Sequence, residues 1–213
     1  MLLTAHGGAL NTGRNSRLYF DTIKAHKVDV IEVDVRKRGD RLYIAHMKSL
    51  FPGKAIQLSY VFEYIKEHNF KVNCDLKERG IIGDVIKLAG EIGVKDKLIF
   101  TGAVRPSDTD KITAGEVYVN ASYYFPVLPK VRNLEKIKEI VFSGGSPHIK
   151  GLNLPYQLTS DSFINKAKEL DIPLSIYTVD NLAELERIIK ADVRNVTTNK
   201  VTDAFEIMKK LSS

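Results

Sequence analysis

The hydrophobic positions of the chain form short apolar runs, separated by longer segments in which apolar residues follow a helical spacing. In the longer segments apolar residues recur three or four positions apart, as Val85, Leu88 and Ile92 do. Alternation of short strands with helices predicts βα units around a parallel sheet. The predicted strands cover residues 2–5, 30–35, 71–75, 97–101, 116–120, 149–152, 174–178 and 193–197.

Eight strand and helix pairs in a chain of this length predict a compact (β/α)₈ TIM barrel, and a doubly wound sheet is the alternative fold. There is no low-complexity tract or linker, so we expect residues 1–213 to form a single domain. Prolines and a Gly-Gly pair within residues 123–145 predict a long irregular loop.

Composition narrows the class of protein. With 44% hydrophobic and 27% charged residues in 213, the chain is globular rather than disordered. The net charge is +6, but the single basic cluster around Arg36 has no interleaved aromatic residues, so we expect no nucleic-acid partner. No apolar run reaches about 18 residues, and the first residues turn polar too early for a signal peptide, so we expect a cytoplasmic protein without stable membrane insertion. The single cysteine, Cys74, fits a reducing compartment.

The first segment that points to chemistry is the second predicted strand. Side chains alternate between the faces of a strand, so Glu32 and Asp34 project to one face and Ile31 and Val33 to the other. Strands of a parallel barrel are mostly apolar, and two inward carboxylates need either a divalent cation or paired basic side chains. Their position at the carboxyl end of a barrel strand favours an active site.

The same spacing recurs on the third predicted strand, where Asp75 and Lys77 share a face. Asp75 offers a third oxygen ligand for a cation, and Lys77 a positive charge for an anionic substrate. A simple ion pair between the two is the structural alternative. Two histidines follow strand-like segments, His6 and His46, and a pair of imidazoles suits acid and base catalysis on a phosphodiester.

Taken in order, these segments resemble the glycerophosphodiester phosphodiesterase family, a group of TIM-barrel enzymes. The resemblance runs through nearly the whole chain and rests on the order and strand-end positions of several individually weak motifs. They are His6-Gly7-Gly8, Arg14-Asn15-Ser16, Glu32-Val33-Asp34, His46-Met47, Asp75-Leu76-Lys77, Tyr177-Thr178-Val179-Asp180-Asn181 and Thr198-Asn199.

The resemblance implies a function and a set of roles. It implies metal-dependent hydrolysis of a small glycerophosphodiester to glycerol 3-phosphate and an alcohol. His6 and His46 are then the acid and base pair, and Glu32, Asp34 and Asp75 bind one Mg²⁺ or Ca²⁺. Lys77 contacts the phosphate. The pocket is expected to include Asn15, Tyr177 and Thr178.

The sequence departs from the family pattern in ways that matter for the substrate. Gly7 stands where the family has arginine, and Arg14 where it has glutamate, so we expect Arg14 to reach the phosphate instead. Asp75 replaces the usual glutamate. The family's insertion after the second histidine is nearly missing, which predicts a more open pocket. We expect Met47 and Phe125 to pack internally, and Tyr123 and Tyr124 are further candidates for the pocket.

Two alternatives stay open. One is a lysophospholipase D or sphingomyelinase D-like enzyme, since those enzymes use a similar site. The Asp75-Leu76-Lys77 motif and the small insertion of this chain also resemble that group. The other is a barrel that binds a phosphorylated ligand without turnover, in line with Gly7.

Overall fold

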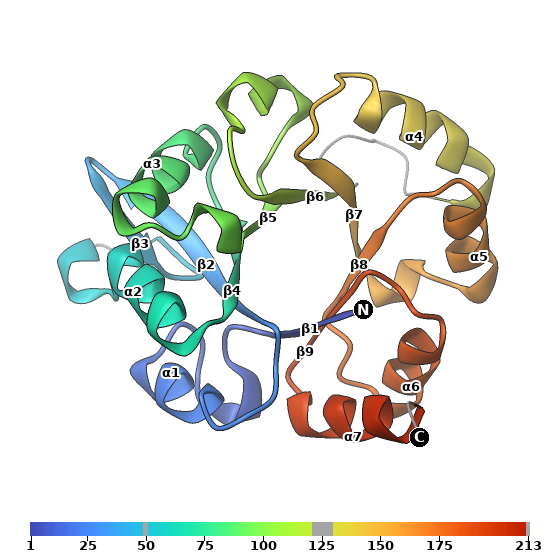
Figure 1. The fold of residues 1–213 in the computed structure, drawn as a ribbon, viewed down its shortest axis with the longest axis horizontal. Coiled ribbons are helices and arrows are strands. Elements are labelled where there is room, and N and C mark those ends of the chain that lie inside the picture. Colours follow the sequence, from blue (N-terminus) through green and yellow to red (C-terminus); the bar gives the residue numbers. More distant parts are fainter. Residues whose placement is uncertain (49–50, 121–129, 212–213) are drawn as a thin grey trace.

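The computed structural model describes residues 1–48, 51–120 and 130–211. Eight parallel strands form a closed barrel, because β1 pairs with both β2 and β9. Figure 1 shows the helices arranged outside this ring of strands. The predicted TIM barrel is therefore confirmed. Its strands are β1 (Leu2–Ala5), β2 (Val30–Arg38), β4 (Lys71–Leu76), β5 (Leu98–Gly102), β6 (Glu116–Asn120), β7 (Ile149–Pro155), β8 (Leu174–Tyr177) and β9 (Asn195–Thr198).

One further strand lies outside the barrel. β3 (Arg41–Ile44) pairs antiparallel with the end of β2, where Val35 is opposite Ile44 and Arg38 is opposite Arg41. Gly39 turns the chain between them with φ +59°, in the left-handed region that glycine tolerates. The hairpin returns the chain to the barrel rim, where His46 follows.

The helices connect the strands and pack around the barrel. They are α1 (Arg17–Ile23), α2 (Leu58–His68), α3 (Ile82–Ile92), α4 (Leu134–Phe142), α5 (Asp161–Glu169), α6 (Leu182–Lys190) and α7 (Val201–Leu211). Ser16, Ser160 and Asn181 begin α1, α5 and α6 by accepting a backbone N–H, at 3.1 to 3.3 Å. None of the described helices is both long and apolar enough to cross a bilayer.

Two sequence predictions for the connections are wrong. The predicted loop over residues 123–145 contains α4, whose Leu134, Ile137 and Val141 are buried at helical spacing. The connection from β5 to β6 holds the 3₁₀ segment Pro106–Lys111 where a helix was expected. The segment Pro106–Lys111 contains no apolar residue other than its proline, so it lacks the apolar stripe of a packed helix.

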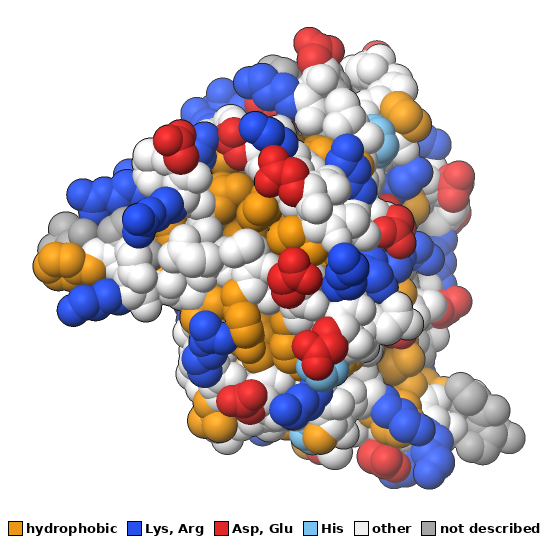
Figure 2. All heavy atoms as spheres, turned by 60° about the vertical axis from the view of Figure 1, so that its left-hand side comes forward, with side chains coloured by type: hydrophobic (Ala, Val, Ile, Leu, Met, Phe, Trp, Pro, Cys, Tyr) orange, Lys and Arg blue, Asp and Glu red, His pale blue; other side chains and the backbone are white. Residues whose placement is uncertain are grey.

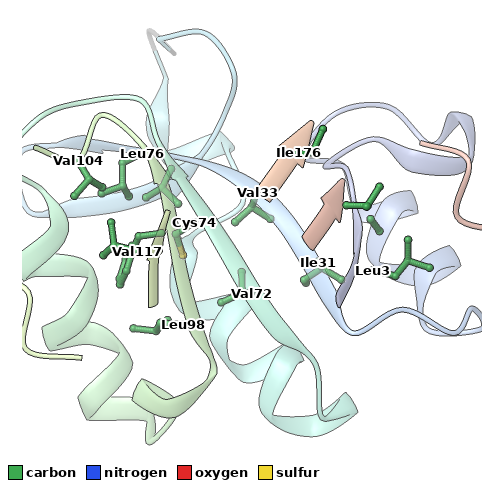
Figure 3. Close-up of a cluster of buried hydrophobic side chains, with 14 of the residues drawn as sticks. Leu3, Ile31, Val33, Val72, Cys74, Leu76, Leu98, Val104, Val117 and Ile176 are labelled. Carbon is green, nitrogen blue, oxygen red and sulfur yellow. The ribbon is translucent and has the colours of Figure 1, made fainter. Parts of the chain in front are cut away.

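The main hydrophobic core lies between the barrel and the helices. Strand residues of one face, such as Ile31, Val33, Val72 and Cys74, point outward into this layer, as Figure 3 shows. Their alternate neighbours point into the barrel, because side chains alternate along a strand.

Inside the barrel, a small apolar cluster is followed by layers of polar side chains in the direction of the carboxyl ends of the strands. Val30, Ile99 and Tyr118 form a small separate apolar cluster. In the neighbouring layer Thr4 donates to Asn195 at 2.7 Å, and Asn195 donates to Ser175 at 2.9 Å. Barrels of this class usually fill these layers with branched apolar residues. The polar interior continues toward the carboxyl ends of the strands, where it opens into a cleft.

Candidate active site

A cleft of about 390 Å³ opens at the carboxyl ends of the strands and brings together most of the predicted site residues. Strand residues i and i+2 share the inner face, which is why the predicted carboxylates and basic groups converge here. The lining residues are His6, Arg14, Glu32, Asp34, His46, Asn73, Asp75, Lys77, Thr101, Gly102, Asn120, Asn153, Tyr177, Thr178 and Thr197.

Three carboxylates form the centre of the cleft. Glu32 and Asp34 come from β2 and Asp75 from β4, and the parallel register places Asp34 directly beside Asp75. One oxygen from each of the three lies within 4.8 Å of the others. This set of hard oxygen donors could hold a divalent cation such as Mg²⁺ or Ca²⁺.

Glu32 is the most confined of these acids. It is 5% exposed and accepts the backbone N–H of Gly7 at 2.6 Å. Burial and the neighbouring charges of Asp34 and Asp75 raise its pKa from 4.5 to about 8. The fold therefore holds a carboxyl group that favours its neutral form unless a positive charge joins it.

Lys77 lies between the two aspartates. Its Nζ is 2.7 Å from Asp34 Oδ1 and 2.5 Å from Asp75 Oδ2. Burial disfavours the charge on Lys77, but both carboxylates outweigh burial and raise its pKa. Burial likewise raises the pKa of Asp75, whereas the contact with Lys77 outweighs burial at Asp34 and lowers the pKa there. The ion pair foreseen as a structural alternative is thus formed, within the cleft.

Asp34 is also fixed by Asn15. Asn15 donates its Nδ2–H to Asp34 Oδ2 at 2.8 Å and accepts the backbone N–H of Asp34 at 3.1 Å. Asn15 is held in a left-handed conformation with φ 52°, and it is not among the residues that line the cleft. The two hydrogen bonds of Asn15 hold the carboxylate of Asp34 in one orientation from outside the cleft lining.

His46 approaches the same aspartate from the rim. Its Nδ1 lies 3.4 Å from Asp34 Oδ2. The guanidinium of Arg36 donates to the backbone oxygen of His46 at 3.2 and 2.7 Å, which ties the loop to β2. Arg36 itself pairs with Glu78 at 3.1 Å. Met47, which we expected to pack internally, is 74% exposed, so that prediction is wrong.

His6 is held by a chain of two side chains from the other end of the sequence. Asn199 donates its Nδ2–H to Asp180 Oδ2 at 2.7 Å, and its backbone N–H to Asp180 Oδ1 at 2.8 Å. Because a carboxylate only accepts, the amide oxygen of Asn199 must face His6, 3.0 Å from Nδ1. The proton of neutral His6 is thereby on Nδ1 and Nε2 is left as an acceptor. Burial lowers the pKa of His6, although the bond to Asn199 partly offsets it.

Amide side chains from neighbouring strands complete the cleft, and the sequence analysis predicted no role for them. Asn120 accepts from Asn153 Nδ2 at 2.8 Å and from the backbone N–H of Gly102 at 3.2 Å. Thr101 donates to Asn73 at 3.1 Å. Asparagine is rare inside strands, and this was the one signal available in the sequence.

The fold has counterparts among solved structures. A glycerophosphodiester phosphodiesterase from Parabacteroides distasonis superimposes with a TM-score of 0.77 at 15% identity, covering 100% of this chain and 98% of the other. One from Agrobacterium tumefaciens gives 0.73 at 16% identity, with 99% of each chain covered. This chain has the glycerophosphodiester phosphodiesterase fold.

A third solved structure with this fold carries a ligand. It is a phosphodiesterase from Oleispira antarctica in complex with the product sn-glycerol-3-phosphate, with a TM-score of 0.74 at 13% identity, covering 98% of this chain and 97% of the other. The sequence matches no model of a known protein family. It also matches no curated protein sequence.

Within this glycerophosphodiester phosphodiesterase fold, the predicted residues divide into two groups. His6, His46, Glu32, Asp34, Asp75, Lys77, Arg14, Tyr177 and Thr178 all line the cleft, whereas Asn15 supports it from behind. Tyr123, Tyr124 and Phe125 lie outside the described residues.

Proposed function

We propose that the protein is a metal-dependent phosphodiesterase that hydrolyses small glycerophosphodiesters to glycerol 3-phosphate and an alcohol. The observation that carries this proposal is the convergence of two histidines, three carboxylates and a lysine on one cleft of this fold. The product bound to the Oleispira antarctica phosphodiesterase supports the same class of substrate.

Glu32, Asp34 and Asp75 are the residues that would hold the cation. The fit rests on the donors themselves, which are three converging carboxylates, one of them buried and short of positive charge. A cation bound there would supply a Lewis acid that neutralises and orients the phosphodiester.

The histidines divide the proton transfers. His6 presents an unprotonated Nε2, so we assign it the role of base toward the 2-hydroxyl of the glycerol. The hydroxyl oxygen bonds to phosphorus as its proton moves to His6, and the bond from phosphorus to the alcohol breaks. His46, paired with Asp34 when protonated, donates a proton to the departing alkoxide. Water then opens the cyclic phosphate as the two histidines exchange roles.

The remaining positive groups of the cleft would bind the phosphate. Lys77 lies beside the carboxylates, and Arg14 lines the cleft from the loop that follows β1. Position 7 carries no side chain, and a Cβ there would lie 2.9 Å from Glu32 Oε2. Arg14 is therefore the arginine of this loop that can serve the substrate.

The test is release of glycerol 3-phosphate from glycerophosphocholine and glycerophosphoethanolamine, with Mg²⁺, Ca²⁺ or EDTA. We expect metal-dependent release that Glu32→Ala and His6→Asn abolish, while His26→Asn, outside the cleft, retains it. Tight binding of glycerol 3-phosphate without turnover under any metal would overturn the proposal in favour of a binding-only barrel.

A further inference from the structure

The rim of the cleft beside His46 carries an exposed apolar and basic surface. The three most exposed large hydrophobic side chains among the described residues are Met47 at 74%, Phe51 at 66% and Leu18 at 57%. They belong to two segments, the first covering residues 7–20 and the second the described residues 41–48 and 51–62, which follow β1 and β2 and so emerge at the end of the barrel where the cleft opens. We call the exposed side chains of these two segments the rim surface.

The two segments lie side by side. Arg14 and His46 line the cleft together. Farther out, Arg17 faces Lys54 and Ile56 across a neighbouring groove. The rim surface is therefore one continuous region.

The charge of the rim surface has one sign. Residues 7–20, 41–48 and 51–62 contain five lysines and arginines and no aspartate or glutamate, so they hold five of the net six positive charges of the chain. The nearest acids in sequence, Asp40 and Asp21, lie just outside these segments, and Glu63 borders the groove. The cationic residues are Arg14, Arg17, Arg41, Lys48 and Lys54.

Cations and apolar side chains are interleaved on this surface. The guanidinium of Arg17 lies 3.7 Å from the ring centre of Tyr60, and Lys54 Nζ lies 5.5 Å from the ring centre of Phe51. Figure 2 shows hydrophobic and basic side chains next to one another on this side of the molecule. Exposed apolar side chains that gather in one region mark an interaction surface.

We propose that the rim surface binds the surface of an anionic phospholipid membrane, with the cleft facing the lipid. Apolar side chains that enter the acyl boundary and cations that contact acidic headgroups together give reversible interfacial binding. Nucleic acid would match the charge, but Leu18 and Met47 are not aromatic, and the rings of Tyr60 and Phe51 each already face a cationic side chain of the same surface, so the surface is a poor stacking platform for bases. The proposal goes beyond the proposed function, because the binding requires neither metal nor turnover.

The experiment measures sedimentation of the full chain with phosphatidylcholine vesicles, with and without roughly a third of phosphatidylglycerol, in EDTA. We expect binding to the anionic vesicles, weakened by salt because surface charges are screened. Phe51→Ser and Met47→Ser should each reduce partitioning about tenfold, from the loss of apolar burial. Lys54→Glu should reduce it at least about fivefold, since each basic residue near the surface contributes about that factor.

Matched controls lie on other parts of the molecule. Leu211→Ser removes an apolar side chain of similar exposure, 49%, at the end of α7, and Lys168→Glu reverses a charge on α5. Both should bind as the unchanged protein does. The proposal is overturned if no vesicles bind, or if the controls lose as much binding as the rim variants. Binding that depends on Lys54 but not on Phe51 or Met47, and that short oligonucleotides displace, would identify a soluble polyanion as the partner instead.

The outcome is separable from that of the proposed function. Phe51→Ser should hydrolyse soluble glycerophosphodiesters like the unchanged protein, because Phe51 does not line the cleft. A protein that binds vesicles but releases no glycerol 3-phosphate would retain the membrane surface and contradict only the phosphodiesterase assignment.

Discussion

Asn199 holds its side-chain oxygen 3.0 Å from Nδ1 of His6, although 193 positions separate the two residues. Asp180 fixes the orientation of that amide, because its Oδ2 accepts from the side-chain Nδ2–H of Asn199 and its Oδ1 from the backbone N–H of the same residue. The arrangement selects one tautomer of His6, and catalysis by a histidine base depends on that choice.

Removal of this contact should impair the chemical step more than substrate binding. We expect Asn199→Ala to lower kcat about 10- to 100-fold, by analogy with the loss seen when the hydrogen-bond partner of a metal-ligating histidine is removed, with KM nearly unchanged. Steady-state kinetics on glycerophosphocholine checks this. Asn181→Ala is the matched control, since Asn181 only begins α6 and its loss should cost about 1 kcal/mol of stability while kcat is kept. Equal kcat for Asn199→Ala and the unchanged protein would contradict the role of the amide.

Glu32 should destabilise the metal-free protein. Its carboxyl group is buried beside two other carboxylates, so Glu32→Gln removes repulsion while the amide oxygen can still accept from Gly7. We expect the free energy of unfolding of the metal-free variant to be about 1–3 kcal/mol higher than that of the unchanged protein, which corresponds to a rise in Tm of several degrees. Differential scanning calorimetry measures this, with the exposed Glu67→Gln as control. The same variant should lose the rise in Tm that Mg²⁺ or Ca²⁺ gives; a variant that still responds to the ion would exclude Glu32 as a ligand.

The same group sets a pH dependence. The pKa of Glu32 is about 8 in the folded protein and near 4.5 in the unfolded chain. As pH rises, the unfolded chain therefore loses this proton at a lower pH than the folded protein does. The contribution of Glu32 to the free energy of unfolding therefore decreases as pH rises from about 5 to 8. Binding of a divalent cation at pH 7 should release close to one proton, and fewer above pH 8. Titration calorimetry in two buffers of different ionisation enthalpy counts these protons. If cation binding to the Glu32→Gln variant released as many protons as binding to the unchanged protein, the released proton would come from another group.

Gly102 should tolerate no side chain. Its φ is +81°, and a Cβ would overlap the Asp75 carboxylate and the backbone of Leu76. We expect Gly102→Ala to cost at least about 2 kcal/mol and to weaken metal binding by displacing Asp75. Gly83→Ala is the control, because a Cβ there meets nothing within 4 Å and α3 should gain about 0.5–1 kcal/mol. Thermal unfolding of both variants with and without Mg²⁺ measures these effects. A Gly102→Ala protein with an unchanged Tm and the same rise in Tm on addition of Mg²⁺ would contradict the steric overlap with Asp75 and Leu76.

The sequence predicted the barrel because its signals are local. Alternation along each strand is enough to place Glu32 with Asp34 and Asp75 with Lys77 on the inner face, and the strand order brings the two pairs together. The single-domain boundaries, the cytoplasmic location and the roles of the site residues stay predictions.

The missed features depend on contacts between distant segments. Nothing near Asn199 in the sequence indicates that its amide faces His6, and the amides of Asn120 and Asn153 meet only because β6 and β7 are neighbours. Helix α4 was missed because the prolines before it predict a loop, although Leu134, Ile137 and Val141 carry the helical spacing. Met47 was misplaced because an apolar side chain at a barrel rim has no local signal for exposure.

The closed ring of strands brings the two ends of the chain together at the site. His6 follows β1 and its partners follow β8 and β9, so they meet only when β1 pairs with β9. A chain emerging from the ribosome carries the carboxylates of β2 and β4 long before it carries Asn199. The contact that orients His6 thus depends on barrel closure, whereas the three carboxylates come from β2 and β4 alone.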